Sequence, residues 1–133
     1  MTHRYCLQCD DGTELVHKRH DLLAQVKNHE TTVKGVLGWH CPVCGDVEFD
    51  PGEGQRYSAA LEELADIIAI EDAAALLKIR KQLGLSQVAA STLTGGGHNA
   101  FSRYERGEAR PMPAVLNLFR LLGKHPELLN ELR

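Results

Sequence analysis

Four cysteines form the group of side chains best suited to hold a metal ion. They stand in two Cys-x-x-Cys pairs, Cys6/Cys9 and Cys41/Cys44, with 31 residues between the pairs. Two intervening residues let one turn direct both sulfurs of a pair toward one ion, and Gly45 lets the backbone approach the thiolates of the second pair. Four thiolates at about 2.3 Å make a closed tetrahedral site. The spacing therefore predicts one structural zinc per chain, with no open position for catalysis.

Three other uses of the cysteines remain open. A disulfide pair and a thiol redox switch are both disfavoured in a reducing compartment. A rubredoxin-like iron centre suits the run Cys41-Pro42-Val43-Cys44-Gly45, but only 5% of the chain is aromatic and could pack around such a centre. The seven histidines are alternative ligands, and His17 and His20 stand three residues apart. Since the cysteines already complete a site, we expect these histidines to lie at the surface.

A second group of residues suits recognition of DNA. The segment from Gly95 to Gly107 predicts a glycine turn, a short helix over about residues 98–106 and a glycine stop. Asn99 and Arg103 stand four residues apart and so point to the same side of that helix. Asn and Arg match the adenine and guanine edges of the major groove, and each correct pair contributes about 1–3 kcal/mol of discrimination. We expect these two residues to read bases.

Other polar side chains of the same region are candidates for phosphate contacts, which position a protein on DNA without specifying sequence. These candidates are Lys78, Arg80, Lys81, Gln87, Ser102 and Arg106. Simple solvation of these side chains, on a plain helical bundle, is the competing interpretation. Phe101 and Tyr104 are three apart and are expected to face the core. The glycines at 95–97 are not a phosphate loop, because no Gly-Lys-Ser/Thr follows, and no nucleophile–base signature indicates an enzyme.

The elements that must position these residues divide the chain in two. Residues 1–56 predict a small β-rich module, because β-branched and aromatic residues with interrupting glycines fill Thr31–His40. After a cluster of helix breakers, residues 57–70 predict a linker helix. Residues 71–133 predict an all-α domain of five helices in helix-turn-helix order. The expected fold class is α+β with two domains, and the first domain needs its metal because so small a core supplies little stability.

Local signals place the helices of the second domain. Asp72 is expected to cap the first helix, which ends at Gly84, and Ser86 is expected to cap the second. A fourth helix is expected over Ala114–Leu122, and a fifth ends at about Leu132.

Charge is distributed unevenly along the chain. Residues 1–70 carry 6 Lys and Arg against 12 Asp and Glu, whereas residues 71–133 carry 9 against 6. The acidic half suits a basic protein and the basic half suits a polyanion, although a solvated acidic surface is the plainer interpretation. No apolar run approaches the roughly 18 residues of a membrane span. The N-terminal residues lack the apolar core of a secretion signal, so we expect a cytoplasmic protein without a membrane partner.

Taken together, the two cysteine pairs, the linker helix and the run from Gly95 to Gly107 resemble the MqsA (YgiT-type) antitoxins of type II toxin–antitoxin systems. The resemblance covers nearly the whole chain, is closest at 95–105 and 124–133, and is loose at 10–36. It implies a zinc-binding N-terminal domain that grips a ribonuclease toxin. It also implies an XRE/Cro-like helix-turn-helix domain that dimerises, binds a palindromic operator and represses the operon. In this family the ligands and base-reading residues would be Cys6, Cys9, Cys41, Cys44, Asn99 and Arg103.

We therefore expect an antitoxin that neutralises a cognate ribonuclease, MqsR-like or of another class, and represses its own operon. Its homodimer would form through about residues 114–132 and place two recognition helices about 34 Å apart. The linker carries Glu62, Glu63 and Asp66 where basic residues would help to clamp phosphates. A stand-alone helix-turn-helix regulator with a structural zinc module is the alternative, and the neighbouring gene separates the two hypotheses.

Overall fold

The computed structural model describes residues 3–133; Met1 and Thr2, the first residues of the segment expected to lack a secretion signal, lie outside that range. The chain divides into two compact units, Met1–Ala65 and Asp66–Arg133, called here the N-terminal and C-terminal units. The division falls inside one helix. The architecture combines an antiparallel sheet with several helices, so the α+β class is confirmed. None of the helices in the described range is long and apolar enough to cross a membrane.

That helix, α1, spans Glu53–Gln82 without a break. A linker helix over residues 57–70 and a separate helix capped by Asp72 were expected here. This expectation is wrong, because both lie within α1. Asp72 lies inside α1, where it is 8% exposed and accepts a hydrogen bond of 2.8 Å from Arg120. The stretch around the expected break is rich in alanine and leucine, which are strong helix formers, so one aspartate does not end the helix.

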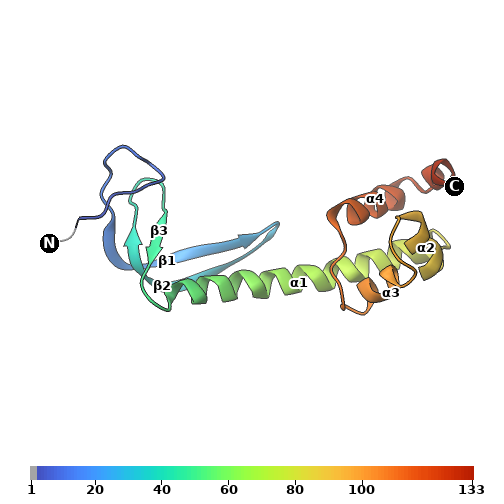
Figure 1. Cartoon of the computed structure of the whole chain (residues 1–133), viewed down its shortest axis with the longest axis horizontal. Helices are drawn as coiled ribbons and strands as arrows, with labels where there is room; N and C mark the ends of the chain where they lie inside the picture. Colours follow the sequence, from blue (N-terminus) through green and yellow to red (C-terminus); the bar gives the residue numbers. More distant parts are fainter. Residues whose placement is uncertain (1–2) are drawn as a thin grey trace. The chain divides into compact units, whose positions relative to one another are not determined.

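The N-terminal unit is built on three antiparallel strands in the order β1-β2-β3. β1 (Val16–Val26) and β2 (His29–His40) form a long hairpin, and β3 (Val47–Phe49) pairs with the end of β2 (Figure 1). Residues 31–40, expected to form strand and turn, lie wholly within the strand β2. The hairpin register shifts next to Asp21, whose carboxylate accepts the Gly35 N–H at 2.8 Å.

One face of this hairpin packs on the first turns of α1 (Figure 1). Ala24, Val33 and Val36 of the hairpin are buried with Leu64 of the helix. Val33 and Val36 are three residues apart and would point to opposite faces of a regular strand, so the register shift between them is what lets both pack in one cluster with Leu64. The resulting core is small and separate from a second buried cluster, which consists of Cys6, Cys41 and Leu15 with Cys9 and Trp39 packed against it.

The C-terminal unit consists of helices around one core. After the end of α1 come α2 (Gln87–Leu93), α3 (Ala100–Glu105), α4 (Pro113–Lys124) and a final 3₁₀ helix, η1 (Pro126–Leu132). The core centres on Leu76 of α1, Phe101 of α3 and Phe119 of α4, all fully buried. Phe101 faces this core as expected, and the half-buried Tyr104 packs against it.

The ends of α1, α2 and α3 share one geometry. Gly84, Gly95 and Gly107 have φ angles of 71°, 74° and 77°. At each glycine two N–H groups turn back to carbonyls of the last helical turn, as in the bonds from Leu85 N to Arg80 O and from Glu108 N to Arg103 O. This is the Schellman geometry, in which a left-handed residue satisfies the last carbonyls of a helix. The predicted glycine stops are confirmed, and they keep α2 and α3 short.

Candidate functional site

The structure brings all four predicted ligands to one place. The Sγ atoms of Cys6, Cys9, Cys41 and Cys44 all lie within 4.8 Å of one another. The Sγ atoms of Cys6 and Cys44 are 3.5 Å apart, and those of Cys9 and Cys41 are 3.8 Å apart. Sulfurs about 2.3 Å from a tetrahedral ion lie about 3.8 Å from each other, so the cluster has the size of a four-thiolate site. The four cysteines can bind one metal ion.

The two cysteine pairs form matching turns, called here the knuckles. In the first, the Asp10 N–H bonds the Cys6 carbonyl at 3.1 Å, and in the second the Gly45 N–H bonds the Cys41 carbonyl at 3.1 Å. Asp10 and Gly45 both have positive φ, 49° and 80°. Backbone N–H groups also point at sulfur, as from Cys44 N to Cys41 Sγ at 3.4 Å. The knuckles therefore orient the sulfurs and partly neutralise their charge.

The pKa values of the Cys41 and Cys9 thiols are shifted in opposite directions. The N–H groups of Cys44 and Val43 lower the pKa of Cys41 to about 6. The hydrogen bond with the Cys44 thiol, together with desolvation, raises the pKa of Cys9 to about 12. One thiolate therefore forms readily and opposes further ionisation beside it. A divalent cation offsets this repulsion, so the donor set fits a metal that binds thiolates.

None of the four cysteines is in a disulfide, and His17 and His20 lie outside their cluster. His17 forms an exposed pair with Asp50, with 2.8 Å between Nε2 and Oδ2, and its ring lies 5.0 Å from that of Trp39. His17 and His20 are surface residues, as expected, but the expectation is wrong for His40, which is 3% exposed and whose Nε2 lies 2.9 Å from the Val36 carbonyl oxygen.

The two expected base-reading residues both lie at the surface of the C-terminal unit. Arg103 is exposed on α3, and Asn99 is exposed at its N-cap position, where it makes no capping hydrogen bond. Ser91 of α2 performs that task instead. Its fully buried hydroxyl accepts the Phe101 N–H at 3.0 Å and donates to the Gln87 carbonyl at 2.8 Å. The Asn99 amide is thus left available for another partner.

Arg80, one of the expected phosphate contacts, is instead bonded within the protein. Its guanidinium forms two hydrogen bonds of 2.9 Å with Glu105 of α3 and a third of 2.9 Å with the Leu85 carbonyl. The side chains of Arg80 and Glu105 are only 12% and 7% exposed. Gln87 also reaches Glu105, at 3.3 Å. Arg80 therefore joins α1 to α3 and is not available to a phosphate.

The remaining candidates differ in their surroundings. Lys78 and Lys81 are exposed on α1, and Ser102 is half-buried on α3. Arg106 is exposed and pairs with Glu108 at 3.0 Å. Lys78 lines a hollow between α1 and α4 together with Arg120 and other residues, and this hollow does not include α3.

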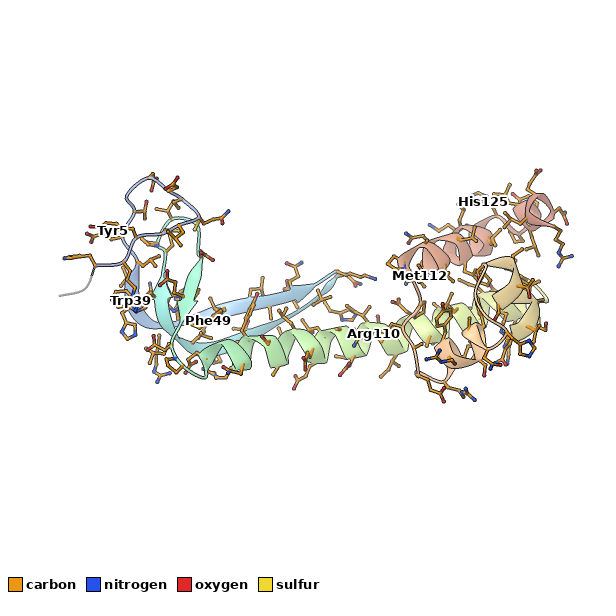
Figure 2. The ribbon with its side chains drawn as sticks, viewed as in Figure 1. Tyr5, Trp39, Phe49, Arg110, Met112 and His125 are labelled. Carbon is orange, nitrogen blue, oxygen red and sulfur yellow. The ribbon has the colours of Figure 1, made fainter. Side chains whose placement is uncertain are left out.

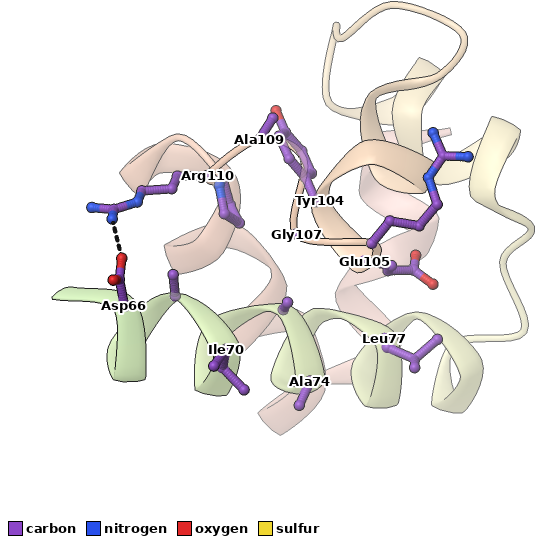
Figure 3. Close-up of a pocket in the computed structure, with 13 residues that line it drawn as sticks. Asp66, Ile70, Ala74, Leu77, Tyr104, Glu105, Gly107, Ala109 and Arg110 are labelled. Atoms are coloured by element: carbon purple, nitrogen blue, oxygen red, sulfur yellow. Dashed lines mark hydrogen bonds and ion pairs between the residues drawn. The ribbon is translucent and has the colours of Figure 1, made fainter. Parts of the chain in front are cut away.

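Sequence reasoning missed a groove in the C-terminal unit. It has a volume of about 590 Å³ and lies between α1 and the segment from Tyr104 to Pro111 (Figure 3). Ile70, Ala74 and Leu77 are among the α1 residues that line it, and an Asp66–Arg110 ion pair of 3.0 Å stands at one end. The sequence feature that could have indicated this groove is the set of small and apolar residues of α1 that line it, such as Ile70, Ala74 and Leu77.

Comparisons with known proteins agree with these features. The family described as the antitoxin component of bacterial toxin–antitoxin systems, MqsA, matches residues 4–133. The antitoxin MqsA of Escherichia coli (strain K12) is 38% identical over 130 residues, which cover 96% of this chain and 98% of that relative. Both matches include the knuckles and α3. The chain therefore belongs to the MqsA family of antitoxin components of bacterial toxin–antitoxin systems.

Proposed function

We propose that this protein is a non-enzymatic antitoxin with two activities. The N-terminal unit neutralises a ribonuclease toxin, and the C-terminal unit binds operator DNA and represses the operon that encodes both proteins. Both activities belong to the cytoplasm. Family membership supports the first activity, and the exposed pair Asn99 and Arg103 supports the second.

The second activity rests on a helix-turn-helix formed by α2 and α3, with α3 as the recognition helix. The observation that supports it is that the residues which fix α3 in the fold are different from the polar residues which it exposes. Phe101 anchors the helix in the core and Ser91 caps it from α2, while Asn99 and Arg103 stay exposed. Within residues 3–133, neither of these two side chains has a protein partner in an ion pair or a side-chain hydrogen bond. Arg103 is suited to guanine and Asn99 to adenine.

A homodimer formed through the C-terminal unit would present two copies of α3 to the two halves of a palindromic operator, about 34 Å apart. Lys78, Lys81, Gln87, Ser102 and Arg106 remain candidates for phosphate contacts, which add affinity without sequence preference. The exposed pair of Arg106 with Glu108 does not prevent such a contact, because exposed ion pairs contribute little.

The DNA activity is tested by titrating the protein into its own promoter and into a random duplex of equal length. We expect Arg103→Ala to weaken promoter binding by about 1–3 kcal/mol and to leave random binding nearly unchanged. Arg106→Ala is the matched control, since it should weaken both duplexes equally and reduce the salt dependence by about one phosphate. Equal losses on both duplexes for Arg103→Ala would make it a phosphate contact only.

We propose that zinc, one ion per chain, is held by Cys6, Cys9, Cys41 and Cys44. Four cysteine sulfurs at the observed spacing form a closed site, and a bound zinc would stabilise the knuckles without taking part in a reaction. Metal analysis of the purified chain tests this, and iron with visible colour would favour a rubredoxin-like centre.

The toxin activity is tested with the product of the adjacent gene. We expect the two proteins to purify as a complex and the chain to stop RNA cleavage by its partner at one-to-one stoichiometry. An adjacent gene whose product neither cleaves RNA nor binds the chain would leave a stand-alone regulator with a structural zinc module.

A further inference from the structure

The tips of the two knuckles expose large apolar side chains. Leu7 is 83% exposed and Val43 is 71% exposed, among the most exposed apolar side chains of the described residues. Each is one of the two residues between the cysteines of its knuckle. Tyr5, labelled in Figure 2, is 52% exposed beside the first knuckle. Such side chains gain nothing from folding at these positions, and exposed apolar clusters mark interaction surfaces.

The two tips belong to turns whose cysteine sulfurs lie in one cluster. Leu7 directly follows Cys6, and Val43 directly precedes Cys44, and the Sγ atoms of those two cysteines are 3.5 Å apart. Each tip sits on a turn fixed by an N–H bond to a cysteine carbonyl. The two apolar side chains are therefore presented from a rigid support, which lowers the entropy lost when a partner binds.

Exposed acidic residues lie close to the tips along the chain. Exposed carboxylates follow both knuckles, and they belong to Asp10, Asp11, Glu14 and Asp46. The nearby Arg4 is a positive charge whose guanidinium bonds Glu48 at 3.0 Å and lies 4.9 Å from the Trp39 ring centroid. The surface thus combines an apolar centre with a negative rim, which suits a partner that has an apolar pocket inside a basic face.

We propose that the knuckle tips, with Leu7 and Val43 at the centre and the carboxylates of Asp10 and Asp46 at the rim, are the surface that docks the toxin. This inference rests on the proposed toxin activity and names where that contact is made. A ribonuclease needs a basic face to hold its polyanionic substrate, so the charge of the knuckle surface is complementary to the face that must be covered.

The test measures binding of the zinc-loaded full chain to the purified product of the adjacent gene by calorimetry. We expect the double variant Leu7→Ser/Val43→Ser to weaken binding by at least about 30-fold, the loss typical of a central interface pair. Ile70→Ser is the matched control, since Ile70 is 72% exposed on α1 in the C-terminal unit and should bind as the parent does. Unchanged affinity of the double variant, or a larger loss for Ile70→Ser, overturns the inference.

Two further measurements keep the test decisive. Metal content and circular dichroism show whether the double variant folds, and the single variants Leu7→Gln and Val43→Thr replace it if it does not, each with an expected loss of at least about fivefold. Asp10→Asn/Asp46→Asn should slow association and flatten its salt dependence, while Ile70→Ser should do neither. A parent chain that does not bind the adjacent product refutes the toxin activity itself, whereas parental binding with unaffected knuckle variants refutes only this docking surface.

Discussion

The pair between Arg80 and Glu105 gives the sharpest prediction about the C-terminal unit. Two parallel bonds of 2.9 Å join side chains that are 12% and 7% exposed. Arg80→Ala leaves a carboxylate buried without its cation, which costs about 3–5 kcal/mol. A unit of this size loses about 4–8 °C in Tm for each kcal/mol, so we expect its Tm to fall by at least about 12 °C.

A double-mutant cycle separates the pair from the rest of the packing. The variant Arg80→Met/Glu105→Leu replaces two charges by apolar groups of similar volume and should recover most of the lost stability. Arg106→Ala is the matched control, because among residues 3–133 the ion-pair partner of Arg106 is Glu108 and both side chains are more than half exposed. Its loss should stay below about 1 kcal/mol.

The assay is thermal unfolding followed by hydrogen exchange of peptides from α2 and α3, which reports on the C-terminal unit alone. Fluorescence of Trp39 reports on the N-terminal unit and should not change. If Arg80→Ala leaves exchange in α2 and α3 as in the parent and only weakens DNA binding at low salt, Arg80 is a phosphate contact and the pairing argument is wrong.

Four further outcomes follow from the described contacts. Chelation of the metal should unfold the knuckles while exchange in α2 and α3 stays slow; loss of protection in both units would contradict this. Asp10→Gly should stabilise the first knuckle by about 0.5–1 kcal/mol, because Asp10 holds φ 49° where the second knuckle has a glycine; metal-retention midpoints in denaturant measure it. Ser91→Ala should cost about 1–3 kcal/mol by leaving the buried Phe101 N–H without an acceptor, and chemical denaturation of the C-terminal unit checks this. The Gly35 N–H, with Lys34, lowers the pKa of Asp21. The contribution of the ionised Asp21 to stability should therefore be present above the usual aspartate range and be lost as pH falls through the lowered pKa. An NMR titration that gives Asp21 an ordinary pKa, with Asp21→Asn as control, would refute this.

Much of the candidate site could be predicted because its determinants are local. A Cys-x-x-Cys turn directs two sulfurs by its own backbone, so two such turns predicted four ligands that the structure does bring together. Glycine stops and the Ser86 cap act within one helical turn, and Ser86 accepts the Ala89 N–H at 3.0 Å as expected. The break expected at Asp72 failed because a residue that can cap a helix can also lie within one.

Other features depend on residues far apart in the chain. Arg80 and Glu105 both have the character of surface residues in the sequence, and only the packing of α3 against α1 turns them into a buried pair. Asn99 occupies a cap position by sequence, yet Ser91 takes over its capping role from another helix. The sequence by itself determined where α1, α2 and α3 end and how each Cys-x-x-Cys turn directs its two sulfurs, since neighbours along the backbone decide both. Only the tertiary structure decided which polar side chains are used up inside the protein and which remain for a partner, since burial depends on contacts between distant segments.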